Sequence, residues 1–171
     1  VQRPESMIDT FTGLRNFSAY ADDMKNHYLT DSHVSVILIN IANFASLQKI
    51  LDYDRTNQML KMIAKKLNEK SRAAKSHGAL YSLDQGRFRI VINSFYRDSA
   101  EETARLVNQL FLQPMKIDKF DLNIIAYVCL ANCPEDISTF RSLISFGNDF
   151  HQKLPFNGEV IRADSSKVKS M

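Results

Sequence analysis

The sequence predicts an α+β domain, in which a mixed β-sheet carries helices packed on its faces. Three observations lead to this prediction. Two long apolar runs, residues 34–40 and 120–133, have the composition of strands. Apolar side chains recur every three or four positions over residues 44–67, which is the spacing of helices that bury one face. Two short apolar runs, Ala79–Leu83 and Phe88–Ile92, flank a polar tetrapeptide that contains a glycine, which is typical of a β-hairpin.

Composition limits the class of protein. The chain has 171 residues, 44% of them hydrophobic, so it is long enough for one domain with a substantial core. The net charge of +3 is small and the basic residues are scattered rather than gathered on one stripe, so we expect no nucleic-acid partner. No apolar run reaches the length of a membrane span, so we expect no membrane contact by this fragment. Cys129 and Cys133 lack the second half of a zinc site, and we expect buried free thiols in a reducing cytoplasm.

The first half of the chain alternates helix and strand signals. A loop at residues 7–16 precedes an amphipathic helix at residues 17–28. The run from Val34 has almost no polar residue before Asn40, so we expect a central strand that is covered on both faces. Two helices follow, and their inward side chains are Phe44, Leu47, Ile50 and Leu51 in the first and Leu60, Ile63, Ala64 and Leu67 in the second.

The second half begins with the hairpin. Ser99 and Glu102 have the spacing of a capping box, which predicts the start of a helix that ends before Pro114. A long strand is expected at residues 120–133, a helix at 137–150 and a short strand at 159–162, followed by a polar tail. The order is therefore helix, strand, helix, helix, hairpin, helix, strand, helix and strand.

Three stretches match the motifs of one known family. Residues 9–16 read D-T-F-T-G-L-R-N against an opening motif D-x-L-T-G-L-x-N. Residues 40–64 align without a gap to a strand that ends in D-I-D-x-F-K and to the I-N-D, G-H and G-D motifs that follow it. Residues 82–88 align with the hairpin signature R-x-G-G-D-E-F. The sequence therefore resembles the GGDEF domain, the diguanylate cyclase family, from about Asp9 to about Arg162.

The resemblance implies a fold and domain boundaries. The fold is the palm-like core of nucleotidyl cyclases, with a central, mostly antiparallel five-stranded sheet wrapped by helices. On this basis we expect an N-terminal linker at residues 1–8, a degenerate GGDEF domain at residues 9–163 and a polar C-terminal tail at residues 164–171.

The resemblance also implies that the metal site has been lost. The family joins two GTP molecules into cyclic di-GMP, and this phosphoryl transfer uses a divalent metal. The family's metal carboxylates, the first Asp of D-I-D and the Glu of the signature, align with Asn40 and Arg87, and the other Asp aligns with Ala42. Because a guanidinium in place of a carboxylate repels a metal ion, we expect no catalytic residue, no metal ligand and no cofactor, although active relatives use Mg²⁺.

A vestigial nucleotide site remains as a hypothesis. Gln48 and Asn57 align with the family's base-contacting residues, and Lys153 aligns with a phosphate contact. The candidate nucleotide-binding residues are Asn40, Phe44, Gln48, Asn57, Arg87 and Lys153, and the degenerate signature loop is Asp84, Gln85, Gly86, Arg87 and Phe88.

Each of these assignments has a plainer alternative. Gln48 and Asn57 suit a polar helix surface equally well, and Lys153 suits the end of a helix, where a cation is favoured. Arg87 is either a solvated charge that pairs with Asp84 or a replacement for the metal, with its fork on phosphate oxygens. The four histidines, His27, His33, His77 and His151, are expected to be surface residues.

The predicted function is that of a catalytically inactive regulatory module in bacterial cyclic di-GMP signalling. Such a module would bind a purine nucleotide or none and would modulate an adjacent domain. The alternative is a residual enzyme, either a weak diguanylate cyclase or a nucleotide hydrolase. Because the chain begins at Val1 rather than Met, we expect a piece of a longer, cytoplasmic or membrane-anchored protein. The candidate partners are an adjacent EAL phosphodiesterase or sensor domain, GTP or another purine nucleotide, and a second copy of the chain.

Overall fold

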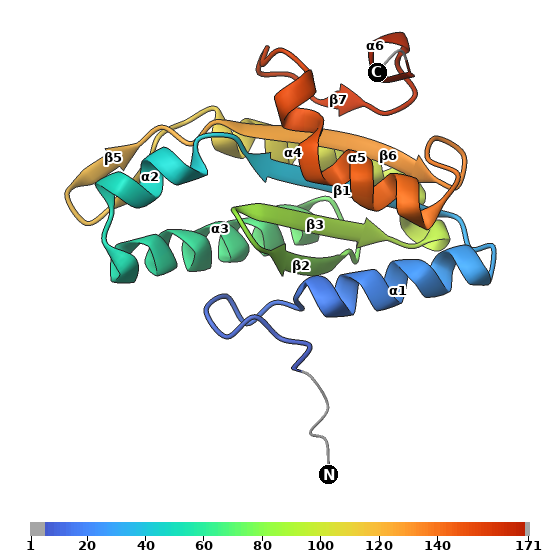
Figure 1. Cartoon of the computed structure of the whole chain (residues 1–171), viewed down its shortest axis with the longest axis horizontal. Helices are drawn as coiled ribbons and strands as arrows, with labels where there is room; N and C mark the ends of the chain where they lie inside the picture. The colour runs from blue at the N-terminus through green and yellow to red at the C-terminus, as the bar shows by residue number, and fades with distance from the viewer. Residues whose placement is uncertain (1–5, 170–171) are drawn as a thin grey trace.

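A five-stranded sheet of order β2-β3-β1-β6-β7 forms the middle of the molecule, as the computed structural model of residues 6–169 shows (Figure 1). Its strands are β1 (Val34–Ile41), β2 (Ala79–Leu83), β3 (Arg87–Ile92), β6 (Ala126–Cys133) and β7 (Ile161–Arg162). All neighbours are antiparallel except β6 and β7. Every residue of β1 is buried, which confirms the prediction of a central strand covered on both faces.

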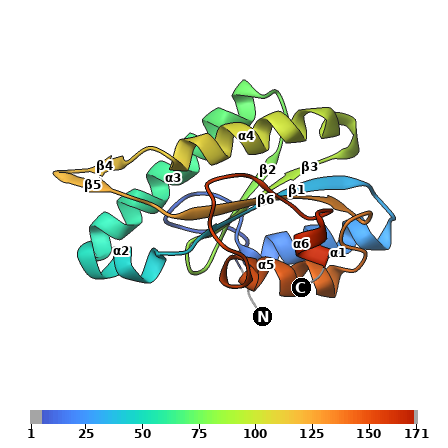
Figure 2. The ribbon, with the colours of Figure 1, turned by 90° about the horizontal axis from the view of Figure 1, so that it is seen from above.

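Helices cover both faces of this sheet (Figure 2). Helices α3 (Tyr53–Ala73) and α4 (Ala100–Phe111) pack on one face, and α1 (Phe17–Leu29) and α5 (Phe140–Lys153) pack on the other. The short helix α2 (Phe44–Ile50) connects β1 to α3. Because side chains alternate along a strand, the odd-numbered positions of β1 face α3 and α4, and the even-numbered positions face α1 and α5. The predicted α+β architecture is confirmed.

The predicted strand at 120–133 is wrong in its first part. It is divided into β5 (Phe120–Leu122) and β6, because β5 folds back on β4 (Met115–Ile117) as a separate two-stranded hairpin. The side chain of Asn43 then holds the link between β5 and β6 by donating to the carbonyl oxygen of Asn123 and accepting from the amide of Ile125.

The predicted capping box is also wrong. The 3₁₀ helix η1 (Ser94–Ser99) runs directly into α4, so Ser99 has a helical backbone and its side chain forms no capping bond. Glu102 pairs with Arg105 instead.

Two further boundaries and the burial of one residue differ from the prediction. The helix expected from residue 137 begins at Phe140, because Thr139 is its N-cap and accepts a hydrogen bond from the amide of Ser142. The strand expected at 159–162 is reduced to β7, and Ile50, expected to face inward, is 57% exposed at the end of α2.

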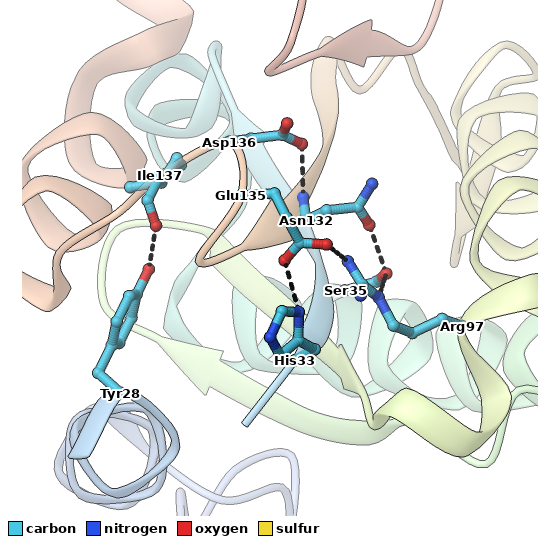
Figure 3. Close-up of polar contacts among 8 residues, drawn as sticks. All are labelled: Tyr28, His33, Ser35, Arg97, Asn132, Glu135, Asp136 and Ile137. Atoms are coloured by element: carbon cyan, nitrogen blue, oxygen red, sulfur yellow. Dashed lines mark hydrogen bonds and ion pairs between the residues drawn. The ribbon is translucent and has the colours of Figure 1, made fainter. Parts of the chain in front are cut away.

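A polar network fastens the end of β1 that is far from the β2–β3 turn (Figure 3). Glu135 pairs with both Arg97 and His33, and the phenolic OH of Tyr28 donates to the carbonyl oxygen of Ile137 at 2.7 Å. The remaining contacts join Ser35 to Asn132, Arg97 to Ser35, and the amide of Asn132 to Asp136. Because Ile137 lies just before α5, the bond from Tyr28 ties this helix to α1 and so helps to fix where α5 crosses the sheet.

The structure describes only part of the predicted N-terminal linker and C-terminal tail. Residues 1–5 and 170–171 lie outside the described residues. Ile8 forms an isolated bridge with Arg15, and a short helix, α6 (Ser166–Lys169), lies within the predicted tail. Within residues 6–169, no helix combines the length and the apolar composition needed to cross a bilayer.

Candidate functional site

The β2–β3 turn is tightly packed against α2. Gln85 (φ 65°) and Gly86 (φ 71°) both have left-handed backbone conformations. A Cβ atom at Gly86 would lie 2.8 Å from Cδ2 of Phe44, so glycine is required there for conformation and for packing. Gln85 adopts this left-handed conformation although it has a side chain, and glycine would adopt it with less strain.

An open pocket of about 700 Å³ lies beside this turn. It is formed by the N-terminal segment, α2, the first half of α3 and the turn. Among the candidate residues, Phe44, Gln48 and Asn57 line it, together with Asp84, Gln85 and Gly86. The structure therefore brings three of the six candidate nucleotide-binding residues together with most of the predicted signature loop.

The pocket also contains residues that sequence reasoning did not assign to the site. Asp9 lines it, and so do Phe11 and Tyr53, whose rings meet edge to face with centroids 5.8 Å apart. Asp9 accepts hydrogen bonds from the amide of Phe11 and, at 2.7 Å, from the hydroxyl of Thr12. The motif at residues 9–16 was the signal, because its Asp and Thr close a loop that presents Phe11 to the pocket.

The lining of this pocket is acidic. Among the described residues that line it there are three carboxylates, Asp9, Asp52 and Asp84, and no Lys, Arg or His. Asp52 caps α3 and pairs with Arg55 at 2.8 Å, whereas Asp9 and Asp84 form no ion pair with a described residue. A phosphate chain in this pocket would therefore meet carboxylates and no lining cation.

The other three candidates, Asn40, Arg87 and Lys153, do not line this pocket. Asn40 and Arg87 are opposite each other in β1 and β3, so both project from the sheet face that α5 covers. Arg87 donates from Nε to the carbonyl oxygen of Asp84 at 2.9 Å and from Nη1 to Oδ1 of Asn148 at 3.1 Å. Lys153 pairs with Asp149 in the last turn of α5, where a cation is favoured.

Arg89 lies at the centre of this second cluster, and sequence reasoning missed it. It is 2% exposed, and Nη1 donates to Oδ1 of Asn40 at 2.9 Å and to the carbonyl oxygen of Phe88 at 2.8 Å. Nη2 donates to the carbonyl oxygen of Gly147 at 2.9 Å. Burial lowers the pKa of the Arg89 guanidinium, since no described carboxylate forms an ion pair with it. The signal in the sequence was a charged residue inside an apolar strand, on the same face as Arg87.

The amide of Asn40 is held on both sides by these contacts. Its Oδ1 accepts from Arg89, while its Nδ2 donates to the carbonyl oxygen of Gly147 at 2.7 Å and contacts Nδ1 of His151 at 3.0 Å. Because Nδ2 is a donor, Nδ1 of His151 must be the acceptor and carries no proton. Asn40 thus links β1 to β3 and to α5.

His151 is therefore part of this cluster, and the prediction that it is a plain surface residue is wrong. It is half-buried, and its ring packs edge-on against Tyr127 with centroids 6.2 Å apart. Burial lowers the pKa of His151, and the nearby guanidiniums of Arg87 and Arg89 lower it further, against an opposing effect of Asp149. Its surroundings therefore favour the neutral imidazole that the bond from Asn40 requires.

The space between the side chains of Asn40 and Arg87, on neighbouring strands, does not suit a divalent cation. Mg²⁺ prefers hard oxygen ligands, usually carboxylates. The side-chain oxygen of Asn40 already accepts from Arg89, and the adjacent side chain at Arg87 is cationic. In residues 6–169, no group of three or more His, Cys, Asp or Glu side chains is arranged to hold a metal ion.

The fold is similar to those of several solved proteins. The GGDEF domain of PA1120 (TpbB or YfiN) from Pseudomonas aeruginosa superposes with a TM-score of 0.73 at 15% identity, over 95% of this chain and 98% of that one. The GGDEF domain of DgcB from Caulobacter crescentus, solved with c-di-GMP, gives 0.71 at 13% identity, over 96% and 100%. The diguanylate cyclase SiaD from Pseudomonas aeruginosa, solved with its activator SiaC, gives 0.70 at 12% identity, over 92% and 62%.

A comparison of the sequence with known families gives a match over most of the chain. No curated protein sequence matches the chain. The family described as "Diguanylate cyclase, GGDEF domain" matches residues 6–149, which include the opening motif, the Asn40–Asn57 region, the signature hairpin and most of α5. This match covers far more than half of the chain and agrees with the similarity to the solved GGDEF domains. The chain therefore belongs to the GGDEF diguanylate cyclase family.

Proposed function

We propose that this chain is a degenerate, non-catalytic GGDEF domain that acts as a regulatory module in cyclic di-GMP signalling. The observation that carries the proposal is the contact between Arg89 and Asn40, because a protein cation holds the side chain that aligns with a metal-binding carboxylate of the family. We expect the chain to use no metal cofactor and to make no cyclic dinucleotide.

The size of the electrostatic effect supports this proposal. A unit charge and a divalent ion about 4 Å apart interact by roughly 8 kcal/mol at an effective dielectric constant of 20. In active relatives, carboxylates make this energy attractive, whereas Arg87 and Arg89 make it repulsive. Asn40 can offer only a neutral carbonyl, and that carbonyl is occupied.

The pocket beside the hairpin supports a binding role that does not depend on metal. Gln48 and Asn57 line it and can donate and accept hydrogen bonds, as a purine edge requires. Since none of the described residues that line this pocket is basic, GTP or another purine nucleotide would be held through its base and not through its phosphates. We therefore propose a weak, magnesium-independent interaction, in which the phosphates project toward solvent.

The regulatory part of the proposal concerns neighbouring domains. We propose that the domain acts in the cytoplasm on an adjacent EAL phosphodiesterase or sensor domain, or on a second copy of the chain. The structure of SiaD with its activator SiaC is a precedent for a GGDEF protein that is regulated by protein contact. The hypothesis that Arg87 contacts phosphate would require its side chain to leave Asn148 and is not part of this proposal.

Isothermal titration with GTP, ATP and cyclic di-GMP, with and without Mg²⁺, combined with a turnover assay in Mg²⁺ or Mn²⁺, tests the proposal. We expect no product, and any nucleotide binding should be the same with and without Mg²⁺. Asn57→Ala should abolish such binding, whereas Asn68→Ala, elsewhere on α3, should not. Formation of cyclic di-GMP or hydrolysis of GTP would instead establish the residual enzyme.

A further inference from the structure

A groove between α3 and α4 forms a second hollow on the surface, with a volume of about 420 Å³. It shares no lining residue with the pocket beside the hairpin. Its principal side chains come from α3, α4 and β4, and they are Met62, Lys66, Lys70, Leu106, Leu110 and Lys116.

The floor of this groove is apolar. Met62 and Leu110 are partly buried and pack against the main hydrophobic core, and Leu106 is also half-buried. Leu106 and Leu110 are one helical turn apart, so they present a continuous apolar strip along α4. A ligand in this groove would therefore bury apolar surface.

The walls of the groove are basic. Lys66, Lys70 and Lys116 line it, and no Asp or Glu is among its described lining residues. None of these three lysines forms an ion pair with a described residue. Lys66 and Lys70 lie one turn apart on α3, where like charges repel each other.

The second half of α3 extends this positive charge. Residues 61–73 contain five basic side chains and one acidic side chain, Glu69. Of these five basic residues, Lys66 and Lys70 line the groove, whereas Lys61, Lys65 and Arg72 do not. The repulsion along α3 would be relieved by a ligand that brings carboxylates.

We propose that this groove binds an acidic amphipathic helix of a partner protein. The apolar side of that helix would lie on Met62, Leu106 and Leu110, and its carboxylates would reach the three lysines, whose long stems allow their charged ends to follow the ligand. A helix presents both chemistries at once, because apolar positions repeat every three or four residues and acidic positions can flank them.

Two other anionic partners fit less well. Nucleic acid is held through aromatic side chains and Arg as well as through Lys, and none of the described lining residues is aromatic or Arg. A lipid surface requires apolar side chains that protrude, whereas Met62 and Leu110 are recessed and pack on the core. Preferential binding of nucleic acid or of a lipid surface would therefore contradict the proposal.

The groove lies apart from the nucleotide pocket and would bind its partner whether or not the domain is catalytic. A display library of random 16-residue peptides, selected against the whole chain, tests it. We expect enriched peptides with apolar residues at helical spacing and several Asp or Glu. Their affinity should fall at least tenfold in the charge-reversed variant K66E/K70E/K116E.

A matched variant separates this site from general electrostatics. K61E/K65E/K119E reverses the same number of charges on α3 and on the β4–β5 hairpin without altering the groove lining, and should bind the peptides as the native chain does. Thermal unfolding of both variants confirms that they are folded. An equal loss in both variants, enrichment without acidic residues, or no enrichment would overturn the proposal. Preferential binding to phosphatidylserine vesicles or to a 20-base-pair duplex DNA would overturn it as well.

Discussion

Arg89 donates a hydrogen bond of 2.9 Å from Nη1 to Oδ1 of Asn40, and this single contact determines which way the Asn40 amide faces. With its oxygen toward Arg89, the amide must present its NH₂ group to the carbonyl oxygen of Gly147 and to His151. One guanidinium therefore positions groups on β1, β3 and α5.

Arg89→Lys should destabilise the domain by at least about 1.5 kcal/mol, the lower limit for one hydrogen bond to a charged group. A lysine has no planar fork, so it cannot reach both Asn40 and Gly147 as Nη1 and Nη2 of Arg89 do. The ammonium would also be buried without a carboxylate partner. The free energy of unfolding in urea measures the change.

The control for this variant is Arg105→Lys, which makes the same substitution in an exposed ion pair with Glu102. Surface substitutions of this kind usually alter stability by less than about 0.5 kcal/mol. If Arg89→Lys were as mild as this control, the fork of Arg89 would not hold the cluster together.

Gly147→Ala should destabilise the domain, although alanine is normally the better helix former. A Cβ atom at this position would lie 2.9 Å from Cδ2 of Leu38 and 3.1 Å from Nη2 of Arg89, and both side chains are buried and fixed. Overpacking costs about 1–3 kcal/mol, against a gain of about 0.5–1 kcal/mol in helix propensity. Ser145→Ala, at an exposed position of the same helix, should be neutral or stabilising in the same urea experiment. A stabilised Gly147→Ala would mean that the contact with Arg89 is loose.

Hydrophobic pattern was enough to predict the sheet. β1 is buried at every position, as its nearly continuous apolar run predicted, and the β2–β3 hairpin follows from its two short apolar runs. The same pattern failed at residues 120–133, because nothing in an apolar run distinguishes one long strand from two strands with different partners.

The candidate site could be predicted only in part. Phe44, Gln48 and Asn57 line one pocket, and the helical spacing and the family motifs were enough to predict that they belong to one site. The cluster around Arg89 depends on tertiary contacts between β3 and α5, which are far apart in the sequence, as the 58-residue separation of Arg89 from Gly147 illustrates. A single sequence shows that Arg89 lies on a buried strand, but it does not show what it binds.

Asn40→Asp should raise the pKa of His151. The new carboxylate would pair with Arg89, and its second oxygen would replace the NH₂ group that now faces Nδ1 of His151. That oxygen is an acceptor, so the imidazole must carry a proton on Nδ1 to satisfy it. An NMR titration of the histidine ring protons measures the change, with His151→Gln used for assignment. Asn123→Asp, at an exposed position, adds the same charge elsewhere and should leave this titration nearly unchanged. An unaltered His151 in Asn40→Asp would contradict the assigned direction of the Asn40 amide.

The lowered pKa of His151 also predicts how stability depends on pH. In the unfolded chain a histidine titrates near about pH 6.5, and in the folded chain His151 takes up its proton only at lower pH. Between these two values the unfolded state binds more protons, so the contribution of His151 is fully present above about pH 6.5 and is lost as the pH falls through its folded pKa. Replacing His151 with Gln keeps an acceptor for Asn40 but cannot titrate, so urea midpoints between pH 7.5 and 5 should fall less steeply in this variant. Identical slopes for native protein and His151→Gln would show that Asn40 does not hold a neutral imidazole.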